Sequence, residues 1–295
     1  MKLRNLIAPM IFGAFFIPSS LIAQDDLLDL LGDDEPTRDY ATAGFKTTRV
    51  INNHSFEMNS PGVLDFKISH RFGAINSGGG NAFGLDNALM RLGLDYGVNE
   101  WLNLGIGRSG GALKYFDGFA KIKFLRQQTG LKNIPISALW ISDMAIDANP
   151  HNEYDPYYFS HRLIYSNQLI IGRKFSDGFS LQIMPTHIHR NFVNTKAEAN
   201  DVFSIGAAGR VKLSNRVAIN AEYHYVLPNQ LDPRYRNSIS IGFDIETGGH
   251  VFQLHFTNST GMIEPAFITQ TTENWLDGGI HFGFNVSRVF TVHRP

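Results

Sequence analysis

Histidine beside arginine is the first combination in this chain that could do chemistry. It occurs in three short motifs, at residues 69–71, 160–162 and 187–190. Alternate residues of an extended strand share a face, so His187 and His189 could together bind a divalent metal ion such as zinc, copper or nickel. Two imidazoles are only the start of a metal site, and histidines near strand ends more often hydrogen-bond loops or lipid headgroups. We therefore expect neither a metal nor a cofactor.

Hydrolysis by a serine is a second possible chemistry, and it needs a nucleophile, a base and an orienting group in contact. If the residues around them form strands, His70 and His161 lie on an apolar face, whereas Ser69 and Ser160 point the other way. The sequence shows no recognisable pair of glycosidase carboxylates. We do not expect an enzyme, and a lipid-active hydrolase is kept only as an alternative.

The elements that position these residues are strands, because the chain alternates apolar and polar residues from Gly62 to its C-terminus. In residues 62–73, Leu64, Phe66 and Ile68 fall on one face, and charged or polar residues fall on the other. Charges of both signs recur on the polar face of later segments. This pattern predicts an all-β fold, a transmembrane antiparallel up-and-down β-barrel with lipid outside and a polar lumen. A soluble β-sandwich or lipocalin-like barrel would also alternate, and it is the alternative.

Twelve segments can be assigned to the barrel, with ten or fourteen as alternatives: 62–73, 87–96, 101–109, 116–126, 134–146, 158–175, 179–189, 201–213, 216–227, 237–246, 250–258 and 278–291. Short turns alternate with longer polar loops, including one at 259–277, as in outer-membrane barrels with periplasmic short turns. Segment 134–146 alternates poorly, so its facing is undefined. Segment 45–58 would make an odd, thirteenth strand, so we expect it in the periplasm or folded into the lumen.

The N-terminus carries an export signal. A basic start, apolar residues 6–16 and a small residue at Ala23 predict a signal peptide over residues 1–23. Residues 24–61 are then an acidic periplasmic leader and plug-like segment, and residues 62–295 form the barrel. Leucines among the acidic residues of 24–36 could bind a periplasmic protein, or this stretch is only a spacer. We expect the outer membrane of a Gram-negative bacterium, with its lipid as a partner.

Composition excludes several classes of protein. The chain has no cysteine, which removes disulfides, thiolate zinc sites and lipoprotein acylation. A formal net charge of −1 gives no indication of nucleic-acid binding. Beyond the signal, no stretch approaches the roughly 18 apolar residues of a transmembrane helix.

The polar face of the strands supplies the candidate site. Alternation directs these ionisable side chains into the lumen: Asp65, Lys67, Arg71, Arg91, Asp95, Lys121, Lys123, Arg210, Lys212, Glu222, His224, Asp244, Glu246, His255 and His281. Because an unpaired buried charge is costly, these groups must pair or hold water. They could form a salt-bridged network that fills a closed lumen. They could instead line a narrow pore, biased toward anions by Lys121, Lys123, Arg210 and Lys212.

Several blocks of the sequence resemble one family. They are residues 45–57 and 62–73, followed by 92–97, 105–109, 159–162, 173–176 and 185–190. Together they resemble a Bacteroidota outer-membrane β-barrel family of unknown function, over nearly the whole chain after the signal. The resemblance implies a barrel in a Gram-negative envelope. It implies no substrate and no catalytic residue.

The function expected from these features is a narrow polar pore or transport component for small solutes or ions. Arg49, His54 and Glu57 of segment 45–58 are the candidates for plugging the lumen from the periplasmic side. A non-conducting barrel that anchors or assembles with envelope partners is the alternative.

Overall fold

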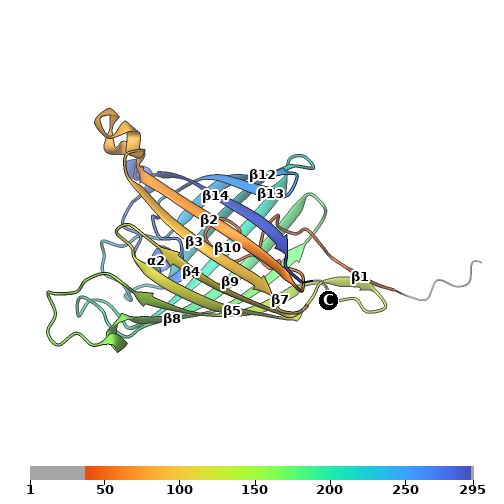
Figure 1. Cartoon of the computed structure of the whole chain (residues 1–295), viewed down its shortest axis with the longest axis horizontal. Coiled ribbons are helices and arrows are strands. Elements are labelled where there is room, and N and C mark those ends of the chain that lie inside the picture. Colours follow the sequence, from red (N-terminus) through yellow and green to blue (C-terminus); the bar gives the residue numbers. More distant parts are fainter. Residues whose placement is uncertain (1–36, 294–295) are drawn as a thin grey trace, which may run out of the picture.

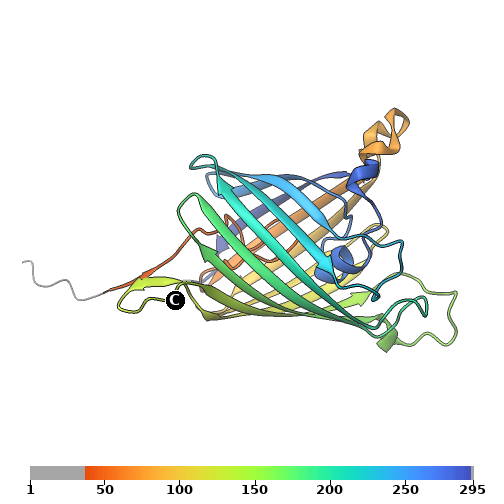
Figure 2. The same ribbon diagram turned by 180° about the vertical axis from the view of Figure 1, so that it is seen from behind.

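Twelve antiparallel strands close into one barrel in the computed structural model of the protein, which describes residues 37–293 (Figures 1 and 2). Each strand pairs with the next barrel strand along the chain, and β14 closes the barrel against β2. The predicted fold class and strand number are therefore confirmed. The predicted signal peptide and residues 24–36 lie outside the described residues. The strands are β2 (Val63–Ala74), β3 (Ala88–Gly97), β4 (Leu102–Ser109), β5 (Tyr115–Leu125), β7 (Ser137–Asp147), β8 (Leu163–Lys174), β9 (Phe179–Arg190), β10 (Asp201–Lys212), β11 (Val217–Val226), β12 (Ile239–Thr247), β13 (His250–Thr257) and β14 (His281–Thr291).

The two ends of the barrel differ in the length of their connections. At one end, which we call the short-turn end, strands are joined by residues 98–101, 175–178, 213–216 and 248–249, with 126–136 as the one longer connection. At the other, the long-loop end, they are joined by 75–87, 148–162, 191–200, 227–238 and 258–280, with 110–114 as the one short connection. The C-terminus lies at the short-turn end (Figure 1).

A small two-stranded sheet projects from the short-turn end (Figure 1). Its strands are β1 (Arg38–Tyr40) and β6 (Gln128–Gly130), and β6 belongs to the connection between β5 and β7. The Arg126 guanidinium lies 4.1 Å from the centroid of the Tyr40 ring. This sheet holds the chain just before it enters the barrel.

Residues 44–59, which we call the plug, fold into the barrel from the short-turn end (Figure 2). Arg49 and His54 form an antiparallel bridge, and the Val50 N–H donates to the Asn53 carbonyl at 2.8 Å, so the plug is a hairpin with a tight turn. Its apolar side chains Phe45, Val50, Ile51 and Phe56 are buried. They pack on inward-facing residues of β5, β7, β8, β9 and β10, namely Phe119, Leu139, Ile141, Ile170, Met184 and Ala208.

A second segment enters from the long-loop end. The connection between β13 and β14 contains α2 (Glu264–Thr269), and every residue of α2 is buried. Phe267 and Ile268 pack against inward-facing residues near that end, which are Tyr115, Ala145, Ile164, Ile188 and Val202. The sequence predicts a polar loop at 259–277, and this is wrong for its apolar part, because those side chains are buried inside the barrel. Within residues 37–293, no helix has the length and apolar character needed to cross a membrane.

Two strands differ from the predicted pattern. β8 begins only at Leu163, because residues 159–162 form the 3-10 helix η3 (Phe159–Arg162), so His161 lies in a loop and not on a strand. In β7, Trp140 is exposed on the outside while Leu139 and Ile141 face the plug. Apolar residues on both faces explain why this segment alternates poorly.

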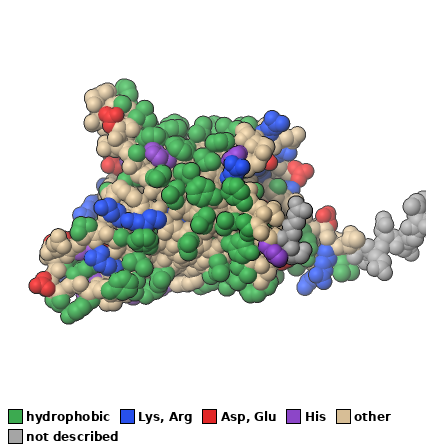
Figure 3. Space-filling model, in the orientation of Figure 1, with side chains coloured by type: hydrophobic (Ala, Val, Ile, Leu, Met, Phe, Trp, Pro, Cys, Tyr) green, Lys and Arg blue, Asp and Glu red, His purple; other side chains and the backbone are tan. Residues whose placement is uncertain are grey.

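The outer wall of the barrel is largely apolar. Hydrophobic side chains cover much of the face in Figure 3, and Asp and Glu side chains appear toward its two ends. Exposed side chains of the wall include Ile106 at 64 %, Ile205 at 54 % and Phe243 at 45 %. The facing predicted from alternation thus holds, with apolar groups outside and ionisable groups inside.

The contact between the plug and β8 can be tested with one methyl group. A Cβ atom at Gly172 would lie 2.1 Å from Cδ1 of Phe56, so Gly172→Ala must displace Phe56. Overpacking of this kind costs about 1–3 kcal/mol. We expect a lower melting temperature in detergent and faster protease cleavage within residues 44–59.

Gly118→Ala is the matched control, because a Cβ there would have its nearest neighbour at 3.6 Å. Equal melting temperatures for the two variants would contradict the docking of the plug on β8.

Candidate functional site in the lumen

Ion pairs line the lumen wall that β2, β3 and β5 form. Lys67 lies between two carboxylates, with its Nζ 2.6 Å from Asp65 Oδ2 and also bonded to Asp95. Arg91 donates two hydrogen bonds to Asp117, and the Nε–Oδ1 distance is 3.0 Å. All five side chains are buried. The pairing offsets the cost of burying these charges.

The turn of the plug is held by one carboxylate of the wall. Glu222 on β11 accepts hydrogen bonds from the backbone N–H groups of Ile51, Asn52 and Asn53, at N–O distances of 3.3, 2.9 and 3.2 Å. Three amides that converge on one carboxylate form an anion-binding turn. Glu222 therefore fixes the turn of the plug to the barrel wall.

Two cations of the wall hold the carbonyl groups of the plug. Lys121 Nζ donates to the Ser55 and Glu57 carbonyls at 2.7 and 2.6 Å. Arg210 donates to the Gly44 carbonyl at 3.2 Å. These two side chains are occupied by the plug, so in this state they do not form the free, anion-attracting wall that an open pore would have.

The plug and α2 meet in the middle of the lumen. Arg49 Nη1 lies 3.0 Å from Glu264 Oε1, and both side chains are buried. His54 Nε2 lies 3.8 Å from the same oxygen. Burial, with Arg49 and Lys121 nearby, holds the pKa of His54 well below its usual range. The Arg49–Glu264 pair, which we call the latch, is therefore the charged link between the two inserted segments.

The structure places most of the predicted lumen residues inside the barrel. The buried ones are Asp65, Lys67, Arg71, Arg91, Asp95, Lys121, Arg210, Glu222, His224, Asp244, His255 and His281. Three others lie at the rim of the short-turn end and are only half-buried, because the strands run out of the barrel there: Lys123, Lys212 and Glu246. Of the plug candidates, Arg49 and His54 are buried, and Glu57 accepts the Gly44 N–H at 2.7 Å.

Asp117 and Asp143 are buried lumen carboxylates that the sequence analysis misses. Asp117 has the same parity as Lys121 on β5, so alternation alone could have identified it. Asp143 lies on β7, where alternation fails, and the Ser166 hydroxyl is 3.5 Å from its Oδ1. No sequence pattern marks Asp143 as inward-facing.

Residues 107–111 match the G-x-S-x-G pattern of hydrolase nucleophiles, which the sequence analysis also passes over. In a hydrolase this pattern forms a strand-to-helix turn. Here Ser109 ends β4, and the chain continues into β5. Its buried hydroxyl has no hydrogen-bond partner within residues 37–293. The motif therefore lacks both its structural context and a base.

The remaining histidine motifs lie on the outer surface. The His70 ring stacks on Phe284 with 5.0 Å between centroids. His187 Nε2 and His189 Nδ1 each lie 2.8 Å from the same oxygen of Asp201. In residues 37–293, no group of three or more His, Cys, Asp or Glu side chains is arranged to hold a metal ion.

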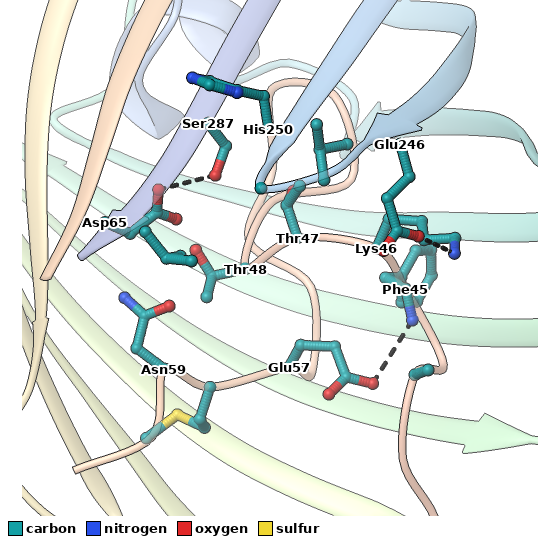
Figure 4. A pocket seen from close by; sticks show the side chains of 15 residues that line it. Phe45, Lys46, Thr47, Thr48, Glu57, Asn59, Asp65, Glu246, His250 and Ser287 are labelled. Carbon is teal, nitrogen blue, oxygen red and sulfur yellow. Dashed lines mark hydrogen bonds and ion pairs between the residues drawn. The ribbon is translucent and has the colours of Figure 1, made fainter. Parts of the chain in front are cut away.

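Two cavities follow the same side of the plug. The larger, which we call the vestibule, measures about 350 Å³ and opens at the short-turn end, where Asp65, Glu57 and Glu246 line it (Figure 4). The smaller, the inner cavity, measures about 20 Å³. Thr47 and Ser287 line both. The lumen is therefore packed on one side of the plug and hollow on the other.

The buried ion pairs of the wall predict that breaking one of them lowers the free energy of unfolding more than breaking an exposed pair does. Arg91→Met leaves Asp117 buried without its partner, which costs about 3–5 kcal/mol. Asp177→Asn removes the exposed pair with Lys174, which has an N–O distance of 2.7 Å, and costs about 0–1 kcal/mol. We expect this order in the free energy of unfolding by urea in lipid vesicles, and equal losses would contradict the role of the buried pair.

The family model "Membrane bound beta barrel domain (DUF5777)" matches residues 45–290. No curated protein matches the chain.

Among solved structures, KdgM porin is 8 % identical to this chain, with a TM-score of 0.49, over 77 % of this chain and 99 % of that chain. NanC porin is 7 % identical with a TM-score of 0.47, over 77 % and 98 %. An outer membrane channel from Pseudomonas putida F1 is 12 % identical with a TM-score of 0.45, over 79 % and 97 %. Likeness at this level says nothing about what the lumen binds. On the family match, the chain belongs to the DUF5777 family of membrane-bound β-barrel domains.

Proposed function

We propose that this protein is a gated outer-membrane channel for small ions or polar solutes in a Gram-negative, Bacteroidota-type envelope. In the state described here, the plug closes it from one side and α2 from the other. The single observation that supports this proposal is that two cavities, the vestibule and the inner cavity, lie on the same side of the plug and share Thr47 and Ser287 in their walls; we call this side of the lumen the lane.

The orientation of the barrel follows from its two ends. Bacterial barrels keep their short turns and chain ends in the periplasm. The short-turn end carries β1 and the C-terminus, and the predicted signal peptide precedes β1. The vestibule then opens to the periplasm, and α2 belongs to an extracellular loop.

The plug divides the lumen into two unlike halves. Toward β5, β7, β8, β9 and β10, Val50, Ile51 and Phe56 make an apolar contact like that of a protein core. Toward β13, β14 and β2, the plug meets polar groups, for example Gln253 and Asn285, which donate to the Val50 and Ile51 carbonyls at 2.7 and 2.9 Å. Water and ions can occupy the polar half, so a small movement of the plug turn or of α2 would connect the lane across the membrane.

A non-conducting barrel that anchors envelope partners is the second candidate. The observation that favours it is the burial of the plug, since Val50 and Ser55 are 0 % exposed. A segment packed this well can be a permanent part of the core. In that case the leader 24–36, which lies outside the described residues, would be the partner-binding element.

Removal of the plug separates the two candidates. We expect the mature protein to show rare, small conductance steps in planar bilayers, and a variant lacking residues 24–60 to conduct steadily. A variant lacking only residues 24–36 is the control, because it keeps β1 and the plug. An electrically silent barrel after deletion of 24–60, still folded by circular dichroism, would refute the channel and favour the anchor.

The latch predicts a more local effect. Glu264→Gln weakens the Arg49–Glu264 ion pair between the plug and α2, so we expect a several-fold rise in open probability. Glu198→Gln is the matched control, because Arg190–Glu198 is also a buried Arg–Glu pair, at 2.8 Å, and among the described residues neither side chain has a hydrogen bond or ion pair to the plug or α2. Equal open probabilities for the two variants would contradict a gating role of the latch.

A further inference from the structure

The cations around the inner cavity differ in how their charge is balanced. Lys67, Arg91 and Arg49 each have a carboxylate within 4.0 Å. Arg71 on β2 has none among residues 37–293, although it is only 1 % exposed. A buried cation without a counter-charge is costly, so its surroundings must compensate for it.

The hydrogen bonds of Arg71 do not supply that charge. Its guanidinium donates to the side-chain oxygens of Asn285 and Asn52 at 3.0 and 2.6 Å and to the His70 carbonyl at 2.9 Å. These acceptors are neutral. The Arg71 Nε–H has no acceptor within the described chain.

Glu222 is the carboxylate on the far side of Asn52. The Asn52 N–H donates to Glu222 at 2.9 Å, while Asn52 Oδ1 accepts from Arg71. Asn52 therefore lies between the two charges. The Glu222 carboxylate accepts three backbone N–H groups of the plug and makes no ion pair with the Arg71 guanidinium.

The inner cavity lies against this arginine. Four cations line it, and its wall contains no carboxylate: Arg49, Lys67, Arg71 and Arg91. Its other polar lining groups are hydroxyls and amides, from Thr47, Asn52, Ser69, Gln253, Asn285 and Ser287. The volume of about 20 Å³ exceeds the roughly 10–15 Å³ that one water needs. A single-atom anion such as chloride is close to this size, whereas the four oxygens of phosphate exceed it.

We propose that the inner cavity is a binding site for a small inorganic anion of chloride size, with Arg71 as its principal ligand. The anion accepts the free Nε–H of Arg71 and balances its charge. A water molecule would accept the same hydrogen bond and leave the charge unbalanced. The site follows from the unpaired charge of Arg71 and not from ion conduction. It is therefore expected whether or not the barrel conducts ions.

Bromide provides a direct test. Crystals of the mature protein grown with bromide in place of chloride should give one anomalous peak in the inner cavity, within hydrogen-bonding distance of the Arg71 guanidinium. We expect Arg71→Met to lose this peak. Water density without anomalous signal at this position in the wild type would overturn the proposal.

Stability in solution tests the same site without crystals. We expect the wild type in detergent to melt several degrees higher in sodium chloride than in sodium gluconate at equal ionic strength, because chloride binds the folded state and gluconate is too large. Arg71→Met should lose this difference. Arg173→Met is the control, because Arg173 is exposed on β8, and it should keep the difference.

A second variant covers the case in which Arg71→Met does not fold. Ser69→Thr adds one methyl group to the wall of this small cavity and keeps Arg71 and the hydroxyl, so it should also lose the chloride dependence. A chloride effect of equal size in Ser69→Thr and the wild type would overturn the site. Both tests are independent of conductance, so a failed channel proposal leaves them intact.

Discussion

The structure depends on one constraint, which is that polar backbone enclosed in a barrel must find partners there. The plug is an irregular hairpin, and the sheet cannot satisfy its amides and carbonyls. Charged side chains of the wall do so instead, with Glu222 on the amides of the turn and Lys121 and Arg210 on the carbonyls. A polar group left unsatisfied at these positions would cost the full price of its desolvation.

That constraint gives the lumen its two unlike halves. On the side of β7 and β8, inward-facing apolar residues form a core with the plug, as Leu139 and Ile170 do at 0 % exposure. On the side of β14, β2 and β3, charges and amides remain, and both cavities lie there. The latch between Arg49 and Glu264 is the point at which the two inserted segments constrain each other.

Much of the fold was open to prediction, and the failures have a physical cause. Alternation is local, so it identified the strands and the inward facing of residues such as Lys67 and Glu222. It failed at β7 because the plug brings apolar contacts to the inner face, so both faces of that strand are apolar. It failed at 259–277 because the burial of Phe267 depends on a space that other strands enclose.

By itself, the sequence determined a closed barrel with an apolar outside and an ionisable inside, and it left segment 45–58 either in the periplasm or folded into the lumen. Only the tertiary structure decided which charges neutralise each other. Arg49 and Glu264 are 215 residues apart, and Lys121 meets backbone carbonyls that no sequence pattern marks. The side of the sheet that a side chain faces depends on its neighbours on one strand. The partner of a charged side chain depends on which strands and inserted segments meet across the lumen. For this reason the composition of the lumen could be predicted, and the unbalanced charge of Arg71 could not.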